Sequence, residues 1–288
     1  MNIALVTCVT KPEIDPDEPF LLEALRARGV TPALLAWDDP AADVRAHDLL
    51  VLRSTWNYHR DLDAFLAWTR HAGAAGRLVN PPHVVAANAQ KSYLVELEAR
   101  GVGIVPTAIV RRGERPSLAA IAGARGWQTV VVKPLVSAGS FRTERFAEGE
   151  LAEGDRFLHD LSADRDVLVQ RWMPAVETSG ERSLVWIDGE LSHAVRKAPR
   201  FSGGHEAVSQ GAVPIGDDER AFAERVLEAS GVRGDLLYAR VDVIRDGDGG
   251  LRLMELELIE PSLFLAQHPP ALERLADAIV ARAAAARA

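Results

Sequence analysis

The first 80 residues alternate short apolar runs with polar loops and helical repeats. Residues 3–9 (IALVTCV) form a continuous run that predicts a buried strand, and FLLEALRARGV spaces its apolar residues as a helix does before Gly29. The runs TPALLAW and HDLLVLRST predict two further strands, and DLDAFLAWTRHAGAAG predicts a second helix. Strands that alternate with helices favour an open parallel sheet with ligand-facing loops at the carboxyl ends of the strands.

The pattern changes after the Asn-Pro-Pro at residues 80–82, which predicts a domain boundary. Residues 104–172 carry short strands and turns around one helix near 117–125. Strands then pair over ERSLVWIDG, ELSHAVRK, YARVDVIRD and GLRLMELELI, with a helix at DDERAFAERVLEASG and an alanine-rich terminal helix from about 270. We therefore expect an α/β protein of three units, at residues 1–86, 87–173 and 174–288.

Composition narrows the class of protein. The 288 residues are 48% hydrophobic and 26% charged, which is ordinary for a globular chain with a sizeable core. The formal net charge of −8 argues against nucleic-acid binding as the main function. No apolar stretch reaches the roughly 18 residues of a membrane span and no basic leader begins the chain, so we expect a cytoplasmic protein. Because Cys8 is the single cysteine, an internal disulfide and a cysteine zinc cluster are excluded.

Three carboxylates mark the two strands joined by the turn DGDGG. Asp242 lies on the first strand, and Glu255 and Glu257 lie on the second, where their spacing of two puts them on one face. Carboxylates that share a face repel one another unless a cation lies between them, and hard oxygen ligands favour Mg²⁺ bound together with substrate phosphates. The sequence predicts a magnesium site here; the alternative is a solvated strand face.

Lys133 ends the apolar run TVVV and is followed by a Ser/Gly loop that includes Ser137, Gly139 and Ser140. Backbone N–H groups and hydroxyls of such a loop can wrap a phosphate chain, and the lysine supplies a cation. Neither GxxxxGK[ST] nor a GxGxxG after the first strand is present, so the nucleotide must be held in another way. The alternative for Lys133 is a side chain that reaches out to solvent.

A strand ending in DVLVQRWMP offers an adenine site. Backbone groups there could read the edge of the base while apolar side chains enclose the ring; the residues are Gln170, Arg171, Trp172 and Met173. An ordinary buried strand that stops at a proline is the alternative. Further along, Arg182, Lys197 and Arg200 supply cations suited to phosphate.

The order of these elements resembles that of the ATP-grasp superfamily, in its glutathione-synthetase-like branch, over about residues 91–262. The resemblance implies an N-terminal Rossmann-like pre-ATP-grasp domain, a central lid domain and a C-terminal antiparallel-sheet domain. It also implies that Lys91 and Lys133 contact the nucleotide, that the loop 137–140 covers the phosphates, and that Glu177 holds the ribose.

The metal ligands implied by the resemblance are Asp242 and Glu255, with Glu257 at the position where the superfamily usually has asparagine. The implied activity is ATP-dependent C–N bond formation through an acyl phosphate, with Mg²⁺ as the metal. Arg182, Lys197 and Arg200 would neutralise charge on the transferring group. Proteins of this kind and size are often homodimers.

The loop RSTWNY and the ending ELELIEPSLF are similar to the small ligases that include the O-ureido-serine cyclo-ligase of cycloserine biosynthesis. This resemblance implies a small amino-acid-like substrate. The expected contacts are Arg53, Ser54, Thr55 and Asn57, with Trp56 and Tyr58 as walls or simply packed at a domain junction. An amino-acid or dipeptide ligase, or a non-catalytic ATP-binding regulatory module, remains the alternative.

Overall fold

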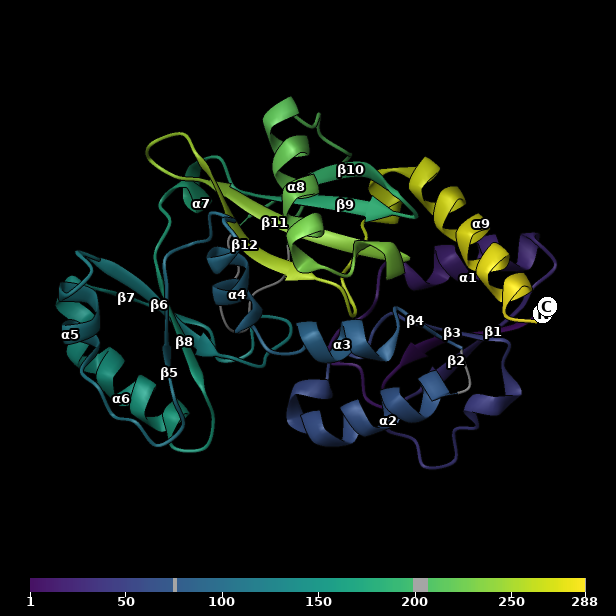
Figure 1. The fold of residues 1–288 in the computed structure, drawn as a ribbon, viewed down its shortest axis with the longest axis horizontal. Coiled ribbons are helices and arrows are strands. Elements are labelled where there is room, and N and C mark those ends of the chain that lie inside the picture. Colours follow the sequence, from purple (N-terminus) through teal and green to yellow (C-terminus); the bar gives the residue numbers. More distant parts are fainter. Residues whose placement is uncertain (75–76, 199–206, 288) are drawn as a thin grey trace.

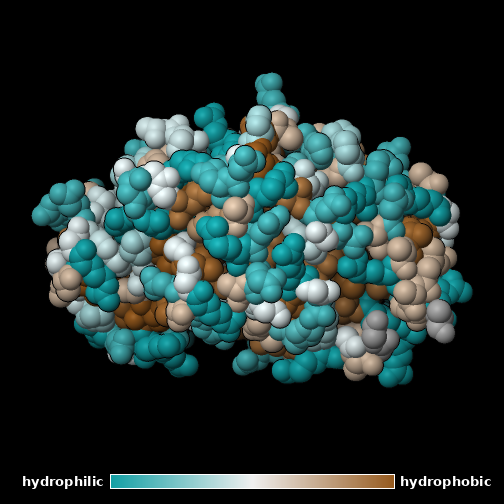
Figure 2. All heavy atoms as spheres, turned by 45° about the horizontal axis from the view of Figure 1, so that its top comes forward, coloured by the Kyte–Doolittle hydropathy of each residue, from teal (hydrophilic) through white to brown (hydrophobic). Residues whose placement is uncertain are grey.

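The computed structural model describes residues 1–74, 77–198 and 207–287, whose strands form three four-stranded sheets. Figure 1 shows the sheets side by side, the second at one end of the molecule and the first at the other. Hydrophilic side chains cover most of the face in Figure 2, with smaller hydrophobic areas between them. No described helix combines the length and the apolar character that a membrane span requires.

The first sheet is parallel, as the alternation of strands and helices predicted. Its order is β2-β1-β3-β4, with bounds Asn2–Thr7 for β1, Thr31–Ala36 for β2, Leu49–Leu52 for β3 and Leu78–Val79 for β4. Helix α2 (Leu62–Ala74) packs on one face. Helix α1 (Glu18–Ala27) packs on the other beside α9 (Pro269–Ala285), which comes from the far end of the chain (Figure 1).

The second sheet is antiparallel and has the order β5-β8-β6-β7. Its strands are β5 (Thr107–Val110), β6 (Thr129–Pro134), β7 (Glu144–Ala147) and β8 (Val167–Arg171). Helices α5 (Leu118–Gly123) and α6 (Leu151–Ser162) cover one face. The α6 helix and strand β7 were not predicted from the sequence. Gly154 of α6 lies so close to α5 that an added Cβ would come within 2.5 Å of Leu118 Cδ2.

The third sheet is antiparallel and forms the floor of the site described below. Its order is β10-β9-β11-β12, with bounds Glu181–Ile187 for β9, Glu190–Lys197 for β10, Tyr238–Arg245 for β11 and Leu251–Glu257 for β12. Helices α8 (Asp217–Ser230) and α4 (Tyr93–Ala99) share its principal core cluster. The short helix α7 (Ala175–Thr178) follows β8, and 3-10 turns occupy Val44–Ala46, Tyr58–Arg60, Glu148–Glu150, Arg233–Asp235 and Leu265–Gln267.

The segment around α3 (Pro82–Asn88) and α4 packs on the third sheet, although it precedes the second sheet in the sequence. The buried Asn88 side chain donates to the Leu256 carbonyl at 2.8 Å and accepts from the Leu258 amide at 2.9 Å. The Tyr93 hydroxyl accepts from the Leu256 amide at 3.0 Å. These side chains satisfy backbone groups at the edge of β12, so that edge is closed and Lys91 is held in a defined place.

Candidate active site

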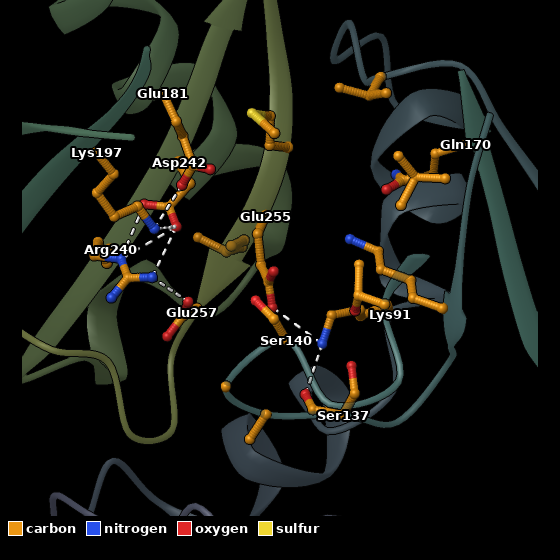
Figure 3. Close-up of a pocket in the computed structure, with 18 of the residues that line it drawn as sticks. Lys91, Ser137, Ser140, Gln170, Glu181, Lys197, Arg240, Asp242, Glu255 and Glu257 are labelled. Atoms are coloured by element: carbon orange, nitrogen blue, oxygen red, sulfur yellow. Dashed lines mark hydrogen bonds and ion pairs between the residues drawn. The ribbon is translucent and has the colours of Figure 1, made fainter. Parts of the chain in front are cut away.

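A pocket lies between the second and third sheets, and loops of the first unit contribute to its lining. Figure 3 shows Lys197, Glu181, Asp242, Arg240 and Glu257 on the strands of the third sheet, with Lys91, Ser137 and Gln170 on the opposite side. The pocket therefore has two walls of different origin, with charged side chains on both.

Strand register brings the floor residues together. Asp242 on β11 lies directly opposite Glu255 on β12, and Arg240 lies opposite Glu257. Positions two apart on a strand share a face, so all four side chains point to the same side of the sheet and line the pocket. The predicted pairing of Asp242 with the two glutamates on adjacent antiparallel strands is confirmed.

Arg240 is the centre of the charged network on this floor. Its Nε donates to Asp242 Oδ1 at 2.9 Å, and Nη2 donates to Asp242 Oδ2 at 2.8 Å and to Glu257 Oε1. Its Nη1 reaches the Ser262 carbonyl at 3.2 Å, and the guanidinium lies 5.5 Å from the centre of the Phe264 ring. A planar guanidinium held by this many acceptors is fixed in orientation.

Lys197 completes the floor from the neighbouring strands. Its Nζ lies 2.6 Å from Glu181 Oε1 and 3.0 Å from Asp242 Oδ2. Two cations therefore share Asp242, which is 1% exposed. This arrangement keeps Asp242 ionised: burial raises its pKa, but Arg240 and Lys197 together outweigh burial and hold the pKa below its usual range.

For two other floor carboxylates, Glu257 and Glu181, the pKa is raised and not lowered. Burial raises the pKa of Glu257 to about 7, with Arg240 opposing the shift and Glu255 adding to it. Burial likewise raises the pKa of Glu181 to about 7 against the pull of Lys197. A cation bound beside these two carboxyls would lower both pKa values, because a nearby positive charge favours the ionised form.

The facing wall supplies cations at the other side of the pocket. Lys91 Nζ donates to the Ser137 carbonyl at 2.8 Å and lies 3.1 Å from Glu255 Oε1, so it links the Ser/Gly loop to the floor. Burial lowers the pKa of Lys133 from its usual value, and the neighbouring Lys91 acts in the same direction while Glu255 opposes it. An anion placed between the two lysines would be attracted to both.

Part of the pocket lining is apolar, which suits an aromatic base. Val105 and Met173 belong to one core cluster with Met254 packed against it, and Val131 and Leu256 also line the pocket. Nine of the residues expected to bind the nucleotide line the pocket, namely Lys91, Lys133, Ser137, Gly139, Ser140, Gln170, Arg171, Trp172 and Met173. The tenth, Glu177, pairs on the surface with Arg145 at 2.8 Å and has a side chain 54% exposed, whereas Glu181 lines the pocket.

The position expected for Arg182 needs correction. Arg182 points to the opposite face of β9, where its guanidinium binds both carboxylate oxygens of Glu219 on α8 at 2.9 Å and donates to the Pro214 carbonyl. Successive residues of a strand face opposite sides, so Glu181 and Ser183 face the site instead. Of the other expected cations, Lys197 lines the pocket, and Arg200 lies outside the described residues.

The loop after β3 is also oriented differently from the expectation. Arg53, Ser54, Thr55 and Asn57 are buried behind the pocket: Arg53 Nη2 donates to the Pro261 carbonyl at 3.0 Å and the Ser54 hydroxyl to Thr7 at 2.9 Å. Asn57 accepts from Trp37 Nε1 at 2.7 Å and donates to Asp38. These side chains therefore hold the loop in shape.

The aromatic residues of that loop face the pocket. Trp56 and Tyr58 line it, together with Glu260, and Trp56 Nε1 donates to the Glu260 carbonyl at 3.0 Å. Arg240, Glu181 and Glu260 were not singled out from the sequence. The spacing of two from Asp242 would have found Arg240; Glu260 carries no comparable signal, because its position depends on the turn after β12.

The donor set suits a divalent cation. Asp242, Glu255 and Glu257 supply hard carboxylate oxygens from directly opposed strand positions, which is the chemistry that Mg²⁺ favours. In the described part of the chain, no three His, Cys, Asp or Glu side chains converge at metal-binding distance, since Arg240, Lys197 and Lys91 occupy these carboxylates. Metal binding by them therefore stays a prediction.

Comparison with known proteins identifies the family. The model described as the N-terminal domain of D-cycloserine synthetase DcsG matches residues 3–80. The cycloserine biosynthesis protein DcsG of Streptomyces lavendulae is 32% identical over 302 positions, which cover 97% of this chain and 98% of that protein. The chain belongs to the DcsG family. The crystal structure of D-cycloserine synthetase DcsG superposes with a TM-score of 0.89 over 98% of this chain and 100% of that one, at 32% identity.

More distant structures share the fold of this DcsG-family chain. The ATP-grasp ligase PsnB has a TM-score of 0.67 at 20% identity, over 97% of this chain and 98% of PsnB. D-alanine–D-alanine ligase from Bacillus anthracis has a TM-score of 0.70 at 13% identity, over 100% of this chain and 98% of that ligase. The fold is therefore ATP-grasp, as expected from the order of motifs. Together with the whole-chain relationship to the D-cycloserine synthetase, this identifies the chain as an ATP-dependent ligase.

Proposed function

We propose that this DcsG-family ligase joins a carboxylate to a nitrogen of a small amino-acid-like substrate through an acyl phosphate. The observation that carries the proposal is the pocket itself, in which cations of two facing walls flank carboxylates on directly opposed strand positions. Phosphoryl transfer requires mainly positioning and charge neutralisation, and the pocket residues supply both.

The pocket suggests how ATP is held. The adenine ring fits the apolar part of the lining, and the phosphates extend toward Lys91, Lys133 and the loop 137–140. Asp242 and Glu255, with Glu257, would hold Mg²⁺, which would neutralise charge on the phosphates. Binding of the metal would draw Glu255 from Lys91 and leave that lysine to bind phosphate.

The reaction would proceed in two steps. A carboxylate oxygen of the substrate attacks the γ-phosphorus, the bond from that phosphorus to the β–γ bridging oxygen breaks, and ADP leaves. A substrate nitrogen then attacks the acyl carbon, the bond to phosphate oxygen breaks, and the N–H proton is released as phosphate leaves. Arg240, fixed by Asp242, is placed to bind the oxygens that carry charge in both steps. Arg240 thus takes the role first expected for Arg182.

The family relationship supports an O-ureido-serine type of substrate, in which the attacking nitrogen and the carboxyl belong to one molecule. The relatives that carry this support are the cycloserine biosynthesis protein and the D-cycloserine synthetase. Ring closure within one substrate would need room for a single small molecule beside the γ-phosphate. Trp56 and Tyr58 limit the pocket on that side.

The test is ADP release from Mg-ATP across a panel of O-substituted serines, single amino acids and dipeptides, with the product identified by mass spectrometry. We expect release with O-ureido-serine that is abolished in Glu255→Gln and retained in Glu177→Gln, whose carboxylate is on the surface. A linear product from two amino acids would favour a dipeptide ligase. ATP binding without turnover of any panel member would favour a regulatory module.

A further inference from the structure

Glu260 is a carboxylate of the pocket lining that the proposed reaction does not use. It follows β12 in the turn before Pro261 and is 8% exposed. Its backbone carbonyl is fixed by Trp56, while its side chain lines the pocket. Within residues 1–74, 77–198 and 207–287, no side chain or amide forms a hydrogen bond or ion pair with the Glu260 carboxylate.

A buried carboxylate without a partner is costly, and the surroundings of Glu260 increase the cost. Burial raises the pKa of Glu260 to about 8, and the charges of Glu257 and Glu255 add to this while Lys91 and Arg240 oppose it. A fold has no structural need for an acid here, since a neutral side chain would avoid the cost. The position therefore calls for a cation that arrives with a ligand.

We infer that Glu260 binds the α-ammonium group of an amino-acid substrate whose carboxylate lies at Arg240. This inference rests on the proposed ligase function and assigns the residue that recognises the α-amino group of the substrate, a group that does not react. Glu260, Arg240 and Ser262 all line the pocket; Glu260 precedes Ser262 by two residues, and Arg240 Nη1 donates to the Ser262 carbonyl. An α-amino acid carries its two charges one carbon apart, which matches an acid and a guanidinium on neighbouring segments.

The aromatic residues beside Glu260 fit the same ligand group. Trp56 and Tyr58 line the pocket next to it, and the rings can face an ammonium group with their negative π surfaces. Burial raises the pKa of the Tyr58 hydroxyl well above its usual value, and the Glu260 charge adds to this shift.

The experiment measures binding of two compounds to the protein with Mg²⁺ and a non-hydrolysable ATP analogue, by calorimetry. One compound is O-ureido-serine, and the other is the same molecule without its α-amino group. Wild type should bind the first roughly 30-fold or more tightly, as expected for a buried charge pair. In Glu260→Gln this preference should fall to a few-fold, with binding of the second compound almost unchanged.

Glu13→Gln is the matched control, because Glu13 is another carboxylate in the pocket lining. Loss of the preference in Glu13→Gln but not in Glu260→Gln would overturn the inference, as would a wild type that does not distinguish the two compounds. A melting curve would show that Glu260→Gln is folded. A binding preference that is lost in Glu260→Gln, together with no ADP release in the turnover assay, would uphold this ammonium site and reject the ligase function. The two failures are therefore distinguishable.

Discussion

Replacing Arg240 by methionine should destabilise the protein more than replacing any exposed arginine. Arg240 is 4% exposed and is bound to both Asp242 and Glu257. Methionine fills a similar volume but leaves Asp242 with Lys197 alone and leaves Glu257 without its cation. The change thus removes one cation from the buried Asp242 and the paired cation from the partly buried Glu257.

The loss in stability of Arg240→Met depends on the interactions that Asp242 and Glu257 keep after the substitution. Breaking a buried ion pair from one side costs about 3–5 kcal/mol. Glu257 can escape part of this cost by taking up a proton, since its pKa is already raised to about 7, and Asp242 keeps Lys197. We therefore expect about 3 kcal/mol, which corresponds to roughly 6–12 °C in melting temperature for a chain of this size.

The assay is thermal unfolding at pH 7 without nucleotide, with Arg245→Met as the control. Arg245 lies on the same strand, and its ion pair with Asp218 is exposed on both sides, so its loss should cost less than about 1 kcal/mol. Combining Arg240→Met with Glu257→Gln should cost less than the sum of the two. Equal melting temperatures for Arg240→Met and Arg245→Met would refute the reasoning.

Three further changes test other parts of the structure. Burial, assisted by His268, lowers the pKa of His193 to about 4, so wild type should lose about 3 kcal/mol as pH falls from 6.5 to 4, and His193→Gln should remove this loss in urea titrations. Gly154→Ala should lower the free energy of unfolding by about 1–3 kcal/mol through its clash with Leu118. Asn88→Ala should cost about 2–4 kcal/mol, because two backbone groups of β12 lose their partner.

Controls for these changes come from the same chain. His83 is mostly exposed, so His83→Gln should not change the loss in free energy of unfolding between pH 6.5 and 4. Gly123→Ala meets no atom within 4 Å and should be neutral or slightly stabilising. For Asn88, an aspartate would keep the acceptor for the Leu258 amide, and a cost equal to that of alanine would contradict the assigned hydrogen bonds.

The sequence predicted that the floor carboxylates share two adjacent strands, because the DGDGG turn joins β11 and β12. Their exact register was not predictable: counting from the turn places Asp242 opposite Met254, but an irregularity between Asp242 and Val243 shifts Asp242 to Glu255. The choice of face on β9 was not predictable either. Both Glu181 and Arg182 are polar residues at the start of a strand. Neighbouring positions face opposite sides of the sheet, so Glu181 points into the pocket and Arg182 points to α8.

The loop after β3 shows a different limit of sequence reasoning. Polar residues in a loop near a sheet edge suggest ligand contacts, but Arg53 and Asn57 are used to satisfy buried backbone and side-chain groups, and the pocket receives Trp56 and Tyr58. Helix α6 was missed although its buried residues Leu151, Leu158 and Leu161 recur at helical spacing, and Gly154 within this pattern lowers the helix propensity. Only the neighbouring α5 explains why a glycine belongs there.

The packing of α9 beside α1 has a consequence for the order in which the molecule is completed during synthesis. The apolar side chains of α1 and β1 share one core cluster with Leu275, Ile279 and Ala283 of α9. The ribosome makes α9 after every other described helix, so the part of this face that α9 covers stays exposed until α9 has been synthesised. Strand β1 and helix α1 are therefore made long before their core cluster is complete.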